Sequence, residues 1–169
     1  RLFEAVAARK MKVRPQQATT TLTPTSGVAA LPSDYLGYTR VTWTGTARRE
    51  LDYVPPPVFQ FDFPTQPTGT PSVFTIEGSN LKVMPSNDTA IEFVYFQRTG
   101  PLASALNWLY TNHFDAYLFG SLCEANAFDK AVDVAGLWKA RRDEVFDEIA
   151  KLDFNERAGM TMQIMGQTP

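Results

Sequence analysis

The sequence has very few of the residues that build catalytic or metal-binding sites. Among its 169 residues there is one cysteine, Cys123, and one histidine, His113. A lone cysteine cannot close an internal disulfide, and thiolate or imidazole metal sites need several such ligands. Glycine-rich phosphate loops and zinc-protease signatures are also missing. We therefore expect no catalytic residues, no cofactor and no metal.

A strong charge of either sign and a long hydrophobic run are lacking as well. Sixteen basic and 18 acidic residues leave a net charge of -2 at pH 7, which gives no sign of a phosphate-binding surface. No stretch approaches the ~20 apolar residues of a membrane span, and no secretory leader is visible. These absences predict a soluble protein without membrane contact. Because the chain starts with Arg1 and helical spacing begins at once, we also expect a preceding segment in the complete protein.

The residues that are present predict an α+β fold with a helical start, a long β region and a helical end. Helical spacing at the start predicts a helix over 1–12. Residues 17–98 are rich in threonine, proline and aromatics and show the two-residue alternation of strands. Helices are predicted over 104–155, and we expect one domain over 1–158. The uncharged, methionine-rich residues 159–169 predict an extended C-terminal arm.

The β region should be a mostly antiparallel sheet. Strands are predicted at 17–23 and 28–31, a hairpin at 41–43 with 51–53, and a meander at 73–77, 81–84 and 90–97. The last of these strands is apolar on both faces, so we expect it in a central position, with helices providing part of its cover. The proline-rich segment 55–71 predicts a loop or an edge excursion.

The helical region shows two apolar stripes. Asn112 is predicted to cap the first helix, with Asp115 in its first turn. The residues expected to face the core are Phe114, Tyr117, Leu118, Leu122, Ala125 and Phe128, followed in the second helix by Val134, Leu137, Trp138, Val145, Ile149 and Leu152.

Few side chains suggest chemistry. Cys123 and His113 are ten residues apart, which is ~15 Å along a helix and beyond hydrogen-bond reach. The carboxylates Asp143, Glu144, Asp147 and Glu148 alternate with Arg141, Arg142 and Lys151 at the spacing of surface ion pairs, which favours a solvated face over a metal site. A hydrolase that uses Glu124 or Asp115 with His113 is another hypothesis. Because these residues form no known catalytic motif in the sequence, only the fold could bring them into a catalytic arrangement.

Aromatic residues gather in the β region, at Trp43, Tyr53, Phe59, Phe61 and Phe63. Their strand-like alternation favours a sheet core with a packed loop. The alternative is a non-catalytic module that binds carbohydrate or peptide through exposed aromatics.

Several stretches, in their order and spacing, resemble the head-to-tail adaptor proteins of tailed phages, the family typified by the SU10 adaptor. The most distinctive is Leu31-Pro32-Ser33-Asp34-Tyr35-Leu36. Others are 13–15 with 19–21, 51–54, 74–78 with 81–85, 92–96, 107–109 and the helical 115–125. Where such proteins often read His-Pro-Asp, this chain has His113-Phe114-Asp115 and lacks the proline that starts a helix.

The resemblance implies a structural virion protein, with no enzymatic role. It would form a closed ring, with a dodecamer expected, in the neck beneath the portal. Its other face would meet tail or nozzle proteins, and DNA would pass only as non-specific cargo during genome ejection. The protein would be made in the host cytoplasm and incorporated during virion assembly.

Two segments are candidates for the interfaces. We expect the arm to dock on a neighbour, most simply the portal, through Met160, Met162, Ile164 and Met165. The proline-rich segment is expected to meet a neighbouring subunit or the tail through Pro55, Pro56, Pro57 and Phe59.

Overall fold

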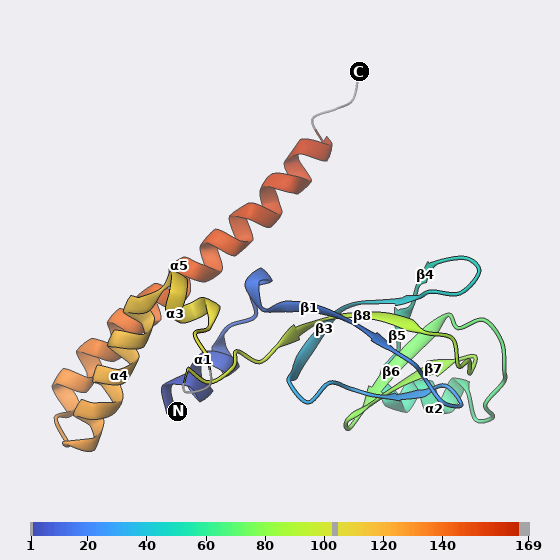
Figure 1. The fold of residues 1–169 in the computed structure, drawn as a ribbon, viewed down its shortest axis with the longest axis horizontal. Helices are drawn as coiled ribbons and strands as arrows, with labels where there is room; N and C mark the ends of the chain where they lie inside the picture. Colours follow the sequence, from blue (N-terminus) through green and yellow to red (C-terminus); the bar gives the residue numbers. More distant parts are fainter. Residues whose placement is uncertain (1, 103–104, 166–169) are drawn as a thin grey trace. The chain divides into compact units, whose positions relative to one another are not determined.

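The computed structural model describes residues 2–102 and 105–165, with side chains described as far as Asn155. Its internal contacts divide the chain into two compact units, Arg1–Gln16 with Arg98–Pro169, and Gln17–Gln97. We call them the helical unit and the β unit (Figure 1). The region expected to be one domain, 1–158, thus comprises two such units, with the β unit inserted into the helical unit.

The helical unit confirms the predicted N-terminal helix and C-terminal helices. Its elements are α1 (Leu2–Lys10), the 3-10 turn η1 (Arg14–Gln16), α3 (Trp108–Asn112), α4 (Phe114–Phe128) and α5 (Val132–Met165). Helices α4 and α5 form a hairpin (Figure 1). The core that α1 shares with them consists of Phe3, Ala7, Met11, Val13, Leu109, Ala116, Tyr117, Val145, Phe146 and Ile149.

The C-terminal end of α5 differs from the prediction. An extended arm was expected over 159–169, whereas 159–165 continue the helix to Met165. A glycine within a helix costs about 1 kcal/mol relative to alanine without ending it, and no proline follows Gly159 before Pro169. The methionines and glutamine of this segment are good helix formers. Residues 166–169 lie outside the described residues.

The β unit consists of two four-stranded sheets. Sheet A has the order β1 (Gln17–Leu22), β8 (Ile91–Gln97), β3 (Tyr35–Trp43), β4 (Arg49–Glu50), and sheet B the order β2 (Val28–Ala30), β7 (Asn80–Met84), β6 (Val73–Glu77), β5 (Asp52–Tyr53). All strand pairs are antiparallel except β5 with β6. The prediction of a mostly antiparallel arrangement is confirmed, although it is split between two sheets.

This split corrects two predicted pairings. In the expected meander, β6 and β7 do pair, but β8 lies in sheet A between β1 and β3. In the expected hairpin, β3 pairs with β4, whereas Leu51 is buried and the chain then enters sheet B as β5. Sequence spacing gives the strands but does not tell a neighbouring strand from one that crosses to a second sheet.

Strand β8 is central, as predicted, but sheet B covers its inner face. The core residues are Val41, Trp43, Leu51, Phe74, Leu81, Val83, Ile91, Phe93 and Tyr95. They come from both sheets, so the β unit is a sandwich with its own core.

Part of the proline-rich segment is helical and not a loop. Helix α2 spans Pro56–Asp62 and begins with proline in its first turn. Proline is favoured there, because its fixed φ suits the helix and the N–H it lacks would have no partner in the helix. The remaining residues up to Pro71 are irregular apart from the isolated bridge Thr68–Ser86.

Candidate interaction surfaces

His113 and Cys123, which were considered for catalysis, both pack within the helical unit. His113 lies between α3 and α4, with its ring against Trp108 at 6.2 Å between centroids. Cys123 is buried on the inner side of α4. Within the described residues, no group of three or more His, Cys, Asp or Glu side chains could hold a metal. No helix in the described part of the chain is long and apolar enough to cross a membrane.

Asn107, and not Asn112, is the asparagine that caps a helix. Its Oδ1 accepts a hydrogen bond from the backbone N–H of Tyr110 at 3.0 Å, which starts α3. Its Nδ2 donates to the Tyr117 hydroxyl at 2.7 Å, which ties α3 to α4. Asn112 ends α3. The signal for Asn107 was its place just before the apolar Trp108-Leu109.

Helix α4 presents apolar side chains on its outer face. Phe114, Leu118 and Phe128 are 54%, 44% and 88% exposed, and the exposed Ala125 continues the row. Together with Ser121, which lies between Leu118 and Ala125, these residues follow one another at intervals of four, three, four and three. Such intervals place side chains along one face of a helix, where a partner can pack. We call Phe114, Leu118, Ala125 and Phe128 the α4 ridge.

The α4 ridge corrects the predicted buried stripe. Of that stripe only Tyr117 is buried, and the inner face of α4 is formed by Ala116, Tyr117, Gly120 and Cys123. The reason is a close contact: a Cβ added to Gly120 would lie 2.1 Å from Cδ2 of Phe3. The small residues therefore face the helical unit's core, where α1 packs.

Helix α5 departs from its predicted stripe in the same way. Val145 and Ile149 are buried as expected, and Trp138 is half-buried, stacked on Phe119. Val134, Leu137 and Leu152 are exposed, and the inner positions that complete the buried face belong to Ala135, Arg142 and Phe146. Both long helices thus leave large apolar side chains uncovered.

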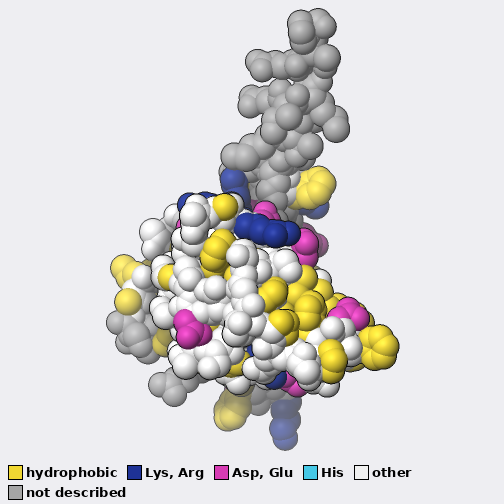
Figure 2. Space-filling view, turned by 90° about the vertical axis from the view of Figure 1, so that its right-hand side faces the viewer, with side chains coloured by type: hydrophobic (Ala, Val, Ile, Leu, Met, Phe, Trp, Pro, Cys, Tyr) yellow, Lys and Arg dark blue, Asp and Glu magenta, His cyan; other side chains and the backbone are white. Residues whose placement is uncertain are grey.

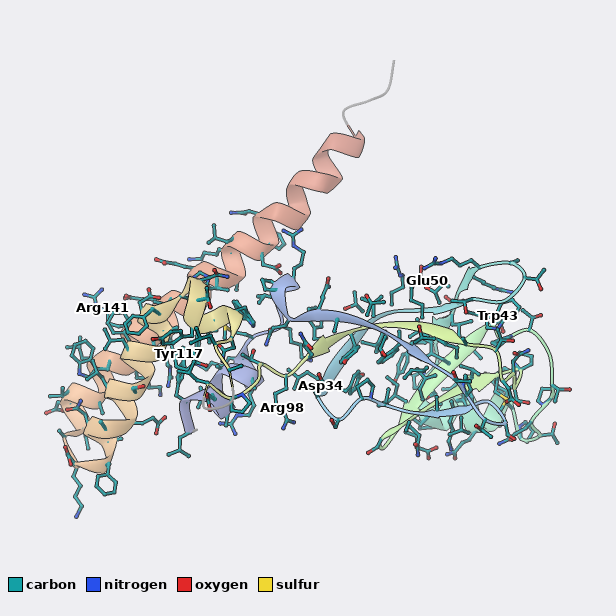
Figure 3. The ribbon with its side chains drawn as sticks, in the orientation of Figure 1. Asp34, Trp43, Glu50, Arg98, Tyr117 and Arg141 are labelled. Atoms are coloured by element: carbon teal, nitrogen blue, oxygen red, sulfur yellow. The ribbon has the colours of Figure 1, made fainter. Side chains whose placement is uncertain are left out.

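The predicted solvated, ion-paired face of α5 is confirmed for Arg141 and Glu144, which pair at its surface, but it is wrong for Arg142, which is buried. The Arg142 side chain is only 5% exposed and lies 2.9 Å from Oδ1 of Asp143, which also accepts from Nζ of Lys10 at 2.9 Å. Burial alone would raise the pKa of Asp143, but the hydrogen bonds from Lys10 and Arg142 outweigh it and lower that pKa. Arg141 points away from the helical pair and pairs with Glu144 (Figure 3).

A groove in the helical unit lies between residues 9–13 and α5. Its walls bear basic and acidic side chains, Arg9, Lys10, Lys12, Asp143, Asp147 and Asp153, around apolar Met11, Val13, Phe146 and Phe154. Lys10 and Asp143 pair across it, and charges of both signs line it. The groove therefore favours no charged ligand of either sign.

A second exposed apolar surface lies on the β unit. In α2, Phe61 is 84% exposed and Val58 is also exposed, while Phe59 is buried against Phe63. Figure 2 shows hydrophobic side chains gathered among polar ones on the β unit. Of the three prolines proposed with Phe59, Pro55 and Pro57 are exposed and Pro56 is half-buried. We call Val58, Phe61 and these prolines the α2 surface.

The aromatic residues of the β unit serve mainly as core. Trp43 is buried in β3, which confirms the predicted sheet core for it. Phe59 is buried and Phe63 is half-buried, so both pack as predicted, although Phe59 lies in helix α2 and not in a loop. Tyr53 remains partly exposed and stacks on Tyr38 at 5.4 Å between centroids.

The distinctive Leu31–Leu36 element has a structural role at the start of β3. Asp34 precedes β3 (Figure 3), and its Oδ1 accepts a hydrogen bond from the Tyr95 hydroxyl at 3.0 Å. Tyr35 packs on Phe93 and Tyr95. The element thereby fixes where β3 begins beside β8.

Comparison with known proteins identifies the family of the chain. No curated protein matches the chain. A family model described as "SU10 adaptor protein" matches residues 2–164, a range that includes the whole β unit and the helical unit from the start of α1 to the last turn of α5. The family indicates a structural role in the phage virion, in accord with surfaces that bear apolar side chains. The chain therefore belongs to the SU10 adaptor protein family, a family of phage adaptor proteins.

Proposed function

We propose that this chain is a head-to-tail adaptor subunit that forms a ring, joins the portal to the tail and continues the DNA channel. Family membership supports the adaptor role. The α4 ridge is the observation that carries the assembly step, because it leaves three large apolar side chains in water.

The energetics favour covering the α4 ridge. Burying a large apolar side chain stabilises a complex by about 1.5 to 3 kcal/mol. A ring needs two different complementary surfaces on each subunit. Val134 and Leu137, exposed on α5, supply apolar side chains for a second surface. A dodecamer is the stoichiometry we propose.

The far end of α5 is the proposed portal contact. The last core residue of α5 is Ile149, while the helix continues to Met165. Those 16 residues would extend ~24 Å at 1.5 Å each. They include Met160, Met162, Ile164 and Met165, and an apolar helix end suits a groove on a partner protein. The α2 surface would face the tail, its nozzle proteins or a neighbouring subunit.

The charge of the chain suits a channel through which DNA slides. From Pro101 to Asp129 the sequence has no lysine or arginine, whereas Asp115, Glu124 and Asp129 are acidic. Acidic walls repel phosphate and so prevent DNA from adhering. DNA would then be non-specific cargo, and the protein, made in the host cytoplasm, would act in the virion neck.

Electron microscopy of the purified protein mixed with its cognate portal tests this proposal. We expect a ring bound coaxially beneath the portal. A chain that stays monomeric and does not bind the portal would contradict the proposal. A variant ending at Arg157 should still form rings but lose portal binding, which separates the two interfaces.

A second candidate is the carbohydrate- or peptide-binding module. The observation in its favour is the partly exposed Tyr38–Tyr53 stack, with Phe61 exposed on α2. Glycan and peptide arrays probed with the purified protein would show saturable binding, lost in Tyr53→Ala, if this candidate is right.

A further inference from the structure

Three of the four sheet edges in the β unit carry features that prevent pairing with another chain. Strand β4 consists of two charged residues, Arg49 and Glu50. Strand β5 has two residues and is followed closely by Pro55, and β2 has three residues between Pro24 and Pro32. Short strands, charges and prolines are the usual means by which sheet edges avoid association.

Strand β1 is the exception. It has six residues, Gln-Ala-Thr-Thr-Thr-Leu, without charge or proline. It pairs with β8 in an unbroken register from Gln17–Phe96 to Leu22–Ile91, so no bulge bends it away. None of its residues is buried, and within the described residues no strand pairs with its outer edge. Its outward N–H and C=O groups are thus a template for another strand.

The edges of a second copy of the chain are poor occupants. Strands β2, β4 and β5 have three residues or fewer. The part of β3 that extends beyond β4 has register shifts at Tyr35/Gly37 and Tyr38/Arg40, and such irregularities twist an edge away from pairing. Pairing of β1 with another β1 is two-fold symmetric and stops at a dimer, so it cannot build a ring.

We propose that β1 accepts an extended, uncharged segment of a different virion protein, which adds a fifth strand to sheet A. The backbone would supply the affinity, as in other cases of strand addition. Thr19 and Thr21 are exposed, so the partner strand would place β-branched or small polar side chains beside them. This inference rests on the proposed function, since it requires the chain to be in the neck.

Hydrogen–deuterium exchange of the free protein and of purified particles tests the proposal. We expect the amides of 17–22 to exchange at least tenfold more slowly in particles than in the free protein. The central strand, 91–97, is the internal control and should be protected in both. Equal exchange of 17–22 in the two samples would overturn the proposal.

A photo-crosslinker identifies the occupant. With Thr21→p-benzoylphenylalanine, we expect irradiated particles to give one main adduct, to a virion protein other than this chain. The matched control is the same substitution at Thr70, which is exposed in an irregular segment. An adduct between two copies of the chain, or no adduct specific to position 21, would overturn the proposal. A protein found in the neck with β1 unprotected contradicts only this inference, whereas absence from the neck contradicts the proposed function as well.

Discussion

The Tyr95 hydroxyl donates a hydrogen bond to the Asp34 carboxylate at 3.0 Å, which joins the central strand of sheet A to the segment that leads into β3. Burial, followed by this carboxylate, raises the pKa of Tyr95 above its ordinary value of 10.0. A raised pKa in the folded state means that the stabilisation is complete below pH 10 and is lost as pH rises through the folded value.

Tyr95→Phe is therefore expected to cost about 1 kcal/mol of unfolding free energy at pH 7, because it removes one hydrogen bond. It should also weaken the loss of stability above pH 10. Urea unfolding at pH 7 and pH 10.5 measures both effects. Tyr38→Phe is the control, since its side chain is partly exposed. An unchanged stability of Tyr95→Phe at pH 7 would contradict the structural role of this bond.

Gly120→Ala should destabilise the helical unit by roughly 1 to 3 kcal/mol, the usual cost of overpacking a core. The new Cβ would meet the Phe3 ring, a close neighbour in the same core. Gly136→Ala is the matched control, because that helical glycine has open space around it. The control should stabilise α5 by up to about 1 kcal/mol. Thermal unfolding separates the two variants, and an equal response from both would count against the Phe3 contact.

Asp143→Asn should reduce stability by roughly 1 to 3 kcal/mol, because Arg142 would remain buried without its charged partner. Because the pKa of Asp143 is lowered in the folded state, its ionised form stabilises the fold at pH values above its ordinary pKa of 3.8. This stabilisation is lost as the pH falls through the folded-state pKa. The variant should therefore lose less stability on acidification to pH 3. Glu144→Gln, which breaks the exposed pair with Arg141, should cost less than about 0.5 kcal/mol. Urea titrations at pH 7 and pH 3 provide both comparisons.

Leu118→Ser combined with Phe128→Ser should prevent assembly while the monomer keeps its melting temperature, because both side chains are exposed within one chain. Mass photometry and thermal unfolding measure the two properties. Leu106→Ser is the control, being 73% exposed but outside the α4 ridge. Rings that form equally well in the double variant and the control would show that another surface joins the subunits.

The sequence predicted element types better than the faces and partners of those elements. The long strand at 90–97 and the helices at both ends follow from periodicity, which is a local property. Gly120 shows why the buried face of α4 was misplaced: hydrophobic size marks residues that can be buried, but the closest helix contact selects the smallest residue. That choice depends on Phe3, more than a hundred residues away.

The exposed apolar surfaces were predicted only in part. The proline-rich segment was expected to be a loop or an edge excursion, because prolines usually interrupt regular structure, yet at the start of α2 they favour a helix. The helix in turn exposes Phe61 and buries Phe59, a distinction that residue type alone could not make. The exposure of the α4 ridge was not predicted, because its residues had been assigned to the core.

The first and last strands of the β unit, β1 and β8, are hydrogen-bonded to each other from Gln17–Phe96 onward. The chain consequently leaves the helical unit after Gln16 and returns to it at Arg98, at two positions that lie close together. Such a module can be lengthened, exchanged or removed in evolution without changing the path of the rest of the chain, so its surface can diversify while the helices keep their own packing.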